Sequence, residues 1–165
     1  MAQADNPMGP MTLPAPLLEH VCDLVVSIAQ PIDVGCTPSG QRRVIPITGG
    51  LVRGPLLNGK VMSAGADFQL LLSGGTQAHL DARYVLELDD GARVFVQNTA
   101  LRVTSVDNAQ RIINGQPVPP EQVYFRCQPR MEVSSPKWSW VNDSQFVGTG
   151  YRAPDGVFLS FYRVL

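Results

Sequence analysis

Two acidic side chains have settings suited to moving protons. Asp67 follows a turn at 64–66 and precedes an apolar stretch, and Glu132 follows the segment 126–130, which begins and ends with arginine. A carboxylate beside a turn often caps that turn. Placed in an apolar pocket it has a raised pKa and serves as a general acid or base. We therefore take Asp67 and Glu132 as the candidate catalytic residues.

Asp81, Arg83 and Arg126 are candidates for holding a ligand. Asp81 and Arg83 stand two residues apart, so in a strand they share one face and can form an ion pair. On the surface such a pair contributes little stability. In a pocket, the arginine would orient a carboxylate or bind an anionic or carbonyl oxygen, and Arg126 is a second anchor of this kind.

Amide, hydroxyl and aromatic side chains complete the expected substrate-binding set. Asn98, Asn142 and Tyr124 are able to donate hydrogen bonds to an oxyanion or phenolate. Trp138 and Trp140 share one face of an expected strand, where they form either core or the apolar wall of a pocket.

Common catalytic motifs are absent from the sequence. It contains no GxGxxG opening a helix, no GxxxxGK[ST], no GxSxG and no HExxH. The metal-ligating types are scarce, namely Cys22, Cys36, Cys127, His20 and His79, and no CxxC occurs. We expect no metal site, no cofactor and no disulfide framework.

Composition favours one globular domain that binds a small molecule. The chain has 165 residues, 44% of them hydrophobic and 16% charged, with a net charge of -1. That supplies a core, but no basic stripe for nucleic acid. No apolar run reaches the roughly 20 residues of a membrane span. Residues 1–16 read as an irregular leader without a secretory signal, so we expect a cytoplasmic protein with its domain at 17–165.

Turn signals recur at short intervals throughout the domain. Examples are Asn58-Gly59, Asp90-Gly91 and Pro154-Asp155-Gly156. This rhythm predicts an antiparallel sandwich or barrel rather than βα units. The expected strands are 17–28, 44–52, 67–72, 78–88, 92–98, 123–133, 138–142, 145–149 and 157–164. One short helix is expected at 108–114, capped by Asp107 or Asn108.

The strand 80–88 alternates between apolar and charged residues. Leu80, Tyr84 and Leu86 fall on one face, and Asp81 and Arg83 on the other. Either the charges face water, or they line a ligand cavity while the apolar face packs against a helix or a partner subunit of a homo-oligomer. Charged strand residues are mostly exposed, which favours the first arrangement.

A set of short segments, taken in order and spacing, resembles a known family. These segments are Ile45–Gly50, Gly54-Pro55, Gly59–Val61, Gly65–Gln69, Leu80–Tyr84, Asp89–Gly91, Tyr124–Arg126, Trp140–Asn142, Val147–Gly150 and Val157–Val164. Together they resemble the family catalogued as domain of unknown function 3237, over nearly the whole chain from about Leu17.

The resemblance implies an all-β fold, a single antiparallel β-barrel of the lipocalin/calycin-like type. It also implies cofactor-free chemistry, in which some relatives in natural-product pathways close an oxygen ring by adding a hydroxyl across a carbon–carbon double bond. Such a reaction needs a shaped pocket, one group that delivers a proton and one that removes it. Matched by motif, the implied site positions are Asp67, Asp81, Arg83, Tyr84, Arg126, Glu132, Trp140 and Asn142.

Three departures from the family pattern fall at expected pocket positions. Phe68 replaces a tryptophan, the segment 96–100 lacks the usual arginines, and 131–133 reads Met-Glu-Val instead of Phe-Glu-Thr. They bear on the ligand and the activity more than on the fold.

Three functions remain open. The first is a cofactor-independent isomerase, lyase or cyclase acting on a small aromatic or enone-like molecule. The second is a barrel that binds a small ligand without chemistry. The third is a barrel filled by its own side chains. The orientation of the row at 81, 83 and 87, and the setting of Asp67, distinguish among them.

Overall fold

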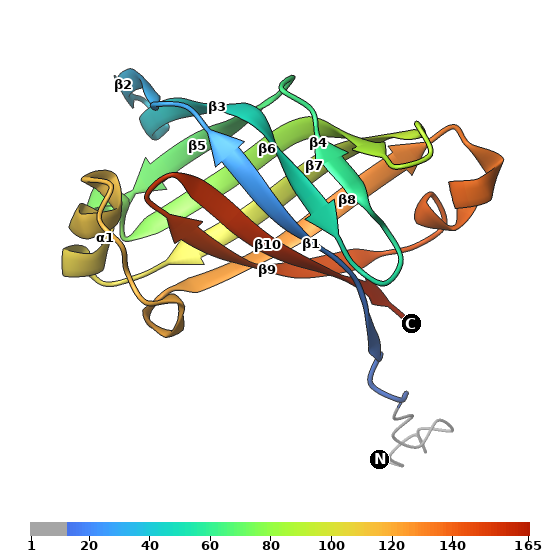
Figure 1. The fold of residues 1–165 in the computed structure, drawn as a ribbon. Coiled ribbons are helices and arrows are strands. Elements are labelled where there is room, and N and C mark those ends of the chain that lie inside the picture. The colour runs from blue at the N-terminus through green and yellow to red at the C-terminus, as the bar shows by residue number, and fades with distance from the viewer. Residues whose placement is uncertain (1–12) are drawn as a thin grey trace, which may run out of the picture.

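The β-prone stretches between the turns form ten strands in the computed structural model, which describes residues 13–165 (Figure 1). The strands are β1 Leu18–Ile28, β2 Ile32–Thr37, β3 Gly40–Arg53, β4 Gly59–Val61, β5 Ala66–Leu72, β6 Gln77–Leu88, β7 Arg93–Val103, β8 Tyr124–Val133, β9 Phe146–Ala153 and β10 Gly156–Val164. The helices are α1 Val106–Ile113 and the 3₁₀ turns η1 Ser73–Gly75, η2 Pro120–Gln122 and η3 Pro136–Val141.

The sheet closes on itself because β1 pairs with both β10 and β3. Every pairing is antiparallel, and β4 and β5 share the place between β3 and β6, so eight strand positions surround the barrel. This confirms the predicted all-β antiparallel barrel with one short helix.

Gly50 allows the close approach of β1 and β3 at this closure. Its φ is 148°, and a Cβ there would lie 2.2 Å from the carbonyl oxygen of Val25. Only a residue without a side chain fits between the two backbones.

The charged side chains of strand β6 lie on the outer face of the barrel. Leu80, Tyr84 and Leu86 are buried inside the barrel, while Arg83 is exposed and Asp81 is half-buried on the outer wall. The charged row therefore faces outward, as charged strand residues usually do.

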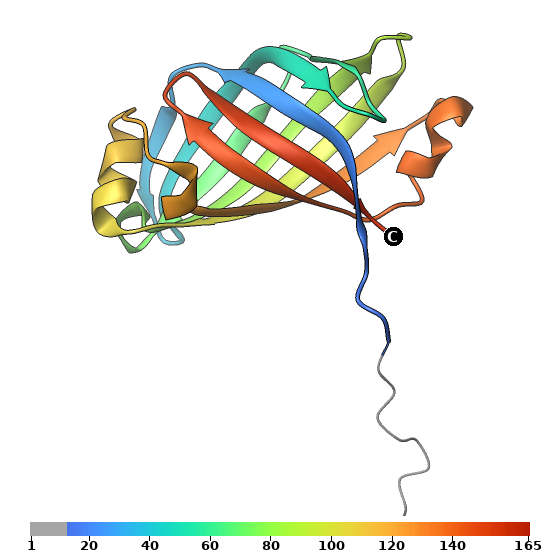
Figure 2. The same ribbon diagram turned by 60° about the horizontal axis from the view of Figure 1, so that its bottom comes forward.

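The helices α1 and η3 lie at opposite ends of the barrel (Figures 1 and 2). Helix α1 begins at Val106 rather than at the predicted 108, and its cap is Ser105, whose hydroxyl accepts from the amide of Asn108. The predicted caps Asp107 and Asn108 are thus wrong. No helix among residues 13–165 is long and apolar enough to cross a membrane.

The predicted strand 138–142 is instead the turn η3. Pro136 opens it, and the amide of Asn142 donates to the carbonyl of Ser139 at 2.9 Å. The two tryptophans consequently do not share a strand face. Trp138 donates to a carboxylate oxygen of Asp90 at 3.0 Å, and Trp140 lies against Phe146.

Two strands were not predicted, because their sequences do not alternate between apolar and polar residues over a long enough stretch. Strand β2 is largely exposed and carries Gly35 at a φ of 95°, where its register with β3 shifts. Strand β4 has three residues. Of the expected leader at 1–16, positions 1–12 lie outside the described residues, and 13–16 are exposed and have no regular secondary structure.

Candidate functional site

A polar cavity of about 50 Å³ lies inside the barrel, toward the end where β7 leads into α1 and β9 turns into β10. Its apolar lining comes from six strands: Val26, Ile28, Ile45, Ile47, Leu80, Ala82, Ala100, Phe125, Val157 and Leu159. Its polar lining consists of Asp67, Gln69, Tyr84, Asn98, Arg102 and Arg152.

Strand register and small neighbours bring these polar side chains inside. Asp67 on β5 and Asn98 on β7 stand on either side of Ala82 in one cross-strand row. Arg102 stands opposite Ala78, which is fully buried. Because alanine side chains are short, longer polar groups from the adjacent strands occupy the space above them.

A hydrogen-bond chain fixes one edge of the Asp67 carboxylate. Arg43 on β3 donates through Nε to Oε1 of Gln69 at 2.7 Å, and Gln69 donates through Nε2 to Oδ2 of Asp67 at 2.5 Å. Gln69 is only 3% exposed. The other carboxylate oxygen of Asp67, Oδ1, takes no part in these hydrogen bonds.

Four buried side-chain atoms lack a protein hydrogen-bond partner among residues 13–165. They are Asp67 Oδ1, Tyr84 Oη, Asn98 Oδ1 and Arg102 Nε. All four residues line the same cavity. Buried polar atoms in native proteins are normally paired, so unpaired ones gathered in one cavity point to a polar guest or a catalytic task.

Burial shifts the protonation equilibria of these groups. Loss of solvent raises the pKa of Asp67, although the Gln69 hydrogen bond and the nearby Arg102 act in the opposite direction. Burial also raises the pKa of Tyr84 well above that of free tyrosine. Burial, reinforced by the charge of Arg43, lowers the pKa of Arg102 to about 10. Asp67 therefore keeps its proton to a higher pH than an exposed aspartate.

This arrangement suits proton transfer combined with stabilisation of an oxygen anion. One carboxylate oxygen of Asp67, a residue that lines the cavity, is buried without a partner among residues 13–165, and Tyr84 and Arg102 offer donors in the same buried lining. Among residues 13–165, no three His, Cys, Asp or Glu side chains cluster as a metal site would require.

Of the residues expected from sequence, the structure brings Asp67, Asn98 and Tyr84, the last expected from the family resemblance, together in this cavity. Asp81 and Arg83 lie on the outer wall, where they form an ion pair of 3.1 Å with the Arg83 side chain 55% exposed. Tyr124 and Arg126 are also outside, with the guanidinium 5.1 Å from the centre of the tyrosine ring.

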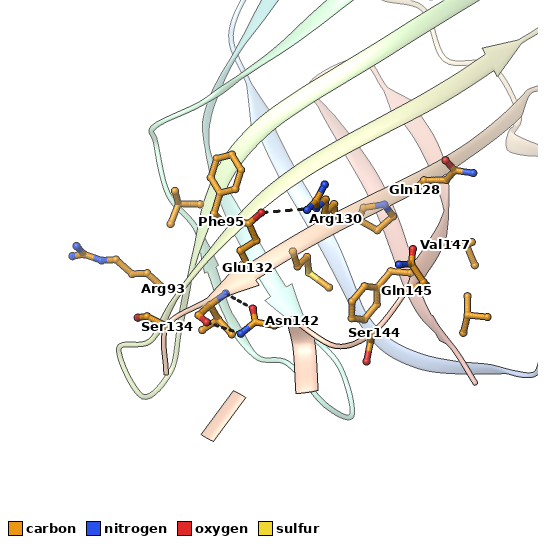
Figure 3. A pocket seen from close by; sticks show the side chains of 16 residues that line it. Arg93, Phe95, Gln128, Arg130, Glu132, Ser134, Asn142, Ser144, Gln145 and Val147 are labelled. Carbon is orange, nitrogen blue, oxygen red and sulfur yellow. Dashed lines mark hydrogen bonds and ion pairs between the residues drawn. The ribbon is translucent and has the colours of Figure 1, made fainter. Parts of the chain in front are cut away.

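Glu132 and Asn142 lie in a separate outer groove (Figure 3). The groove exists because β8 and β9 pair only at Arg126–Thr149 and Cys127–Gly148, and the strands diverge beyond that point. The Glu132 side chain is 62% exposed and lies 3.8 Å from Arg130. Asn142 bonds the amide and the carbonyl of Val133, each at 2.9 Å.

The outer groove is the larger hollow, about 1260 Å³ against about 50 Å³. The cavity nevertheless holds the buried carboxylate of Asp67 and the unpaired donors. Electrostatic interactions are stronger in such a buried place than in an open groove, because water screens them less. Trp140 belongs to neither place; it lies between Phe146 and the guanidinium of Arg163, which is 5.3 Å from its ring.

Sequence reasoning missed Gln69, Arg102, Arg152 and Arg43 as site residues. For Arg102 a signal exists, because it shares one strand face with Val94 and Val96, both fully buried. Arg43 and Arg152 carry no comparable signal, since both lie near hairpins whose strand faces the sequence does not define.

Comparison with known proteins gives a family and a fold. The model of a family described as "Protein of unknown function (DUF3237)" matches residues 16–164. A UPF0311 protein of Rhodopseudomonas palustris is 38% identical over 152 residues, covering 91% of this chain and 99% of that protein.

Two solved structures resemble the barrel. One is described as a beta-barrel like protein from Acinetobacter baumannii; it is 35% identical, with a TM-score of 0.81 over 93% of this chain and 99% of the other. The second is described as an enzyme from Penicillium herquei, 19% identical, with a TM-score of 0.70 over 96% of this chain and 100% of the other. At that identity the likeness shows the fold alone.

Proposed function

The chain belongs to the DUF3237 family of proteins of unknown function, and from this premise we propose that it is a cofactor-independent acid/base enzyme. The reaction class is isomerase, lyase or oxygen-ring-forming cyclase. The substrate is a small carbonyl, enone-like or phenolic molecule whose reacting end enters the barrel.

The observation that carries the proposal is the gathering of unpaired polar atoms around one cavity. Leaving a buried donor or acceptor unpaired costs about 1–3 kcal/mol. A barrel whose interior served only stability would fill this space with apolar side chains. Four such atoms in one place are better explained by a guest that pairs with them.

Asp67 is the proposed proton carrier. Its Oδ2 accepts from Gln69 while Oδ1 has no partner among residues 13–165, so the carboxylate is oriented and has one unused oxygen. In an isomerisation, Asp67 takes a proton from the carbon beside a carbonyl, and the electron pair of that bond moves onto the carbonyl oxygen. Asp67 exchanges this proton with solvent and then delivers a proton to another carbon, while the electron pair returns from the oxygen, with no oxidant or reductant needed.

Tyr84 and Arg102 are the proposed stabilisers of the oxygen anion formed in between. Both place a donor at the cavity wall: Nε of Arg102 is unpaired among residues 13–165, and the hydroxyl of Tyr84 lies beside Asn98. Donors that are already fixed in a water-poor space stabilise a developing charge without having to reorganise. Asn98 adds an amide at the same wall.

Cavity size limits what enters. Sites for drug-sized ligands measure about 300–1000 Å³, whereas this cavity measures about 50 Å³. We therefore propose that only the reacting group enters, while the remainder of the substrate stays at the mouth beside the half-buried Arg152.

The second candidate is a barrel that binds the same guest without chemistry. Ten of the sixteen lining residues are apolar, as a binding pocket would have them. Binding and catalysis differ in one respect that is measurable: only catalysis moves a carbon-bound proton.

Deuterium exchange tests the proposal. The protein is incubated in D₂O with cyclohexanone, 2-cyclohexenone, 2-oxobutanoate and levulinate, and proton NMR follows loss of the C–H signal. We expect exchange with at least one compound, reduced by about 10²–10⁴-fold in Asp67→Asn. The matched control, Asp89→Asn, changes an exposed turn carboxylate and should exchange at the wild-type rate. Equal rates in wild type and Asp67→Asn would refute the catalytic role.

A further inference from the structure

Three arginines gather around the single carboxylate of the cavity. Arg102 on β7 and Arg152 on β9 line it together with Asp67. Arg43 on β3 reaches the same carboxylate through Gln69. We name Arg43, Arg102 and Arg152 the arginine cluster. Their charges influence one another: Arg43 and Arg152 both lower the pKa of Arg102, beyond the effect of burial, whereas Asp67 raises it.

No ion pair balances the charge of the cluster among residues 13–165. Ion pairs join Arg83, Arg93, Arg130 and Arg163 to carboxylates on the outer wall, but none joins a member of the cluster. Asp33, Asp67 and Asp155 act on the cluster from beyond ion-pair distance. Arg102, which is buried, thus lacks a carboxylate in contact, and burial of a charge without such a partner is unfavourable.

Within the cluster, Arg102 is the member free to bind a guest. Arg43 donates to Gln69, and Arg152 donates to the carbonyls of Ala153 and Gly156 in the β9–β10 hairpin. Arg102 is 2% exposed, and its Nε has no partner. Arg102 thus lines the cavity with a buried guanidinium whose Nε donor is unused among residues 13–165.

Asp67 does not neutralise this excess. Its Oδ2 accepts from Gln69, and its Oδ1 is unpaired although it shares the cavity with Arg102. Burial also raises its pKa, which favours the neutral acid. The cavity thus keeps positive charge whether Asp67 is ionised or protonated.

We infer that the molecule taken into the cavity carries a carboxylate, which binds to the free edge of Arg102 with Arg152 flanking it. This rests on the proposed function in placing the guest in the same cavity, and with Arg102 holding the carboxylate, Tyr84 and Asn98 are the groups left to stabilise the oxygen anion. The planar carboxylate matches the planar guanidinium and accepts its N–H groups. About 50 Å³ is room for a carboxylate and a few atoms, and one anionic charge offsets one unpaired arginine.

Affinity for matched acids and amides tests the inference. The full chain is titrated calorimetrically, at constant ionic strength, with acetate, propionate and 2-oxobutanoate, and with acetamide, propionamide and inorganic phosphate. We expect each carboxylate to bind at least about tenfold more tightly than its amide, since a hydrogen bond to a charged group exceeds one to a neutral group by this order. Phosphate should bind more weakly than acetate.

Variants locate the binding site. Arg102→Gln should weaken carboxylate binding by about ten- to a hundredfold, and Arg152→Gln, at the half-buried mouth, by a smaller factor. Arg93→Gln, an exposed arginine of the outer wall, should leave it unchanged. If Arg102→Gln does not fold, as circular dichroism would show, Arg152→Gln decides: undiminished affinity there overturns the inference.

Two other outcomes also overturn it, namely amides that bind as tightly as acids, and phosphate that binds as tightly as acetate. Its failure is separable from that of the proposed function. Carboxylate binding without deuterium exchange sustains the inference and refutes the enzyme. Deuterium exchange confined to cyclohexanone or 2-cyclohexenone, which lack a carboxylate, supports the enzyme and refutes the inference.

Discussion

At the scale of single residues, Asp67 shows how position decides the role of an aspartate. Asp81, one strand away, is ion-paired on the outer wall. Asp67 faces inward, where water is scarce and one of its oxygens remains unpaired. The same side chain is therefore a surface charge in one place and a candidate acid or base in the other.

The raised pKa of Asp67 predicts a pH dependence of stability. An acid whose pKa is higher in the folded state than in the unfolded state binds more protons when folded. The contribution of Asp67 to the free energy of unfolding is thus fully present below the usual carboxyl pKa of 3.8, and it is lost as pH rises through the raised value.

Urea denaturation from pH 4 to pH 8 measures this effect. Asp67→Asn, which cannot ionise, should be more stable than wild type at the upper end of the range, and the difference should shrink toward pH 4. A difference that is constant with pH would show that the Asp67 pKa is not raised. Asp89→Asn serves as the control for a change in net charge.

At the scale of elements, the barrel depends on close contact between β1 and β3, where the sheet closes. Gly50 makes that contact possible, since a Cβ at this position would collide with the β1 backbone. The clash is with main-chain atoms of Val25 and Val26, which cannot rotate away as a flexible side chain can.

Gly50→Ala should therefore destabilise the protein severely, by about 3 kcal/mol or more, combining backbone strain with the displacement of a strand. Gly91→Ala is the matched control: its φ of 86° is also positive, but nothing lies within 4 Å of the added Cβ. Gly91→Ala should lower the free energy of unfolding by only about 1 kcal/mol. Urea denaturation compares the two, and equal losses would mean that the steric contact is unimportant.

At the scale of the whole molecule, the barrel wall is uneven. Strands β6 and β7 pair continuously from Gln77–Val103 to Glu87–Arg93, whereas β8 and β9 are joined at two positions only. The outer groove that holds Glu132 follows from this gap (Figure 3). Local opening takes place where few hydrogen bonds must break.

Amide hydrogen exchange should accordingly be fastest along the β8–β9 gap. Among the strand amides, we expect that of Phe146, on the β8 side of β9, to exchange well before that of Val96, which lies in the ladders to both β6 and β8. Native-state exchange followed by NMR gives the rates. Uniform protection around the barrel would show that the gap is closed in solution.

Much of the fold can be predicted from the sequence, because turn residues and the alternation of apolar and polar residues along a strand are local properties. The alternation at 80–88 places Leu80 inside and Arg83 outside, as the structure has them. The turn η3 was missed because two tryptophans separated by one residue look like a strand. Only the backbone hydrogen bonds after Pro136 show the 3₁₀ turn.

The sequence by itself determined an antiparallel all-β domain, a family resemblance that implied the barrel, and Asp67, Tyr84 and Asn98 as candidates that the structure places at one cavity. Tertiary structure alone decided that Arg43, Arg102 and Arg152 join them, while Glu132 and Arg126 lie on the outer wall. The physical reason is that closure of the barrel gives every strand an inside and an outside. Strands distant in the sequence are then brought to one cavity by cross-strand register, which local pattern does not encode.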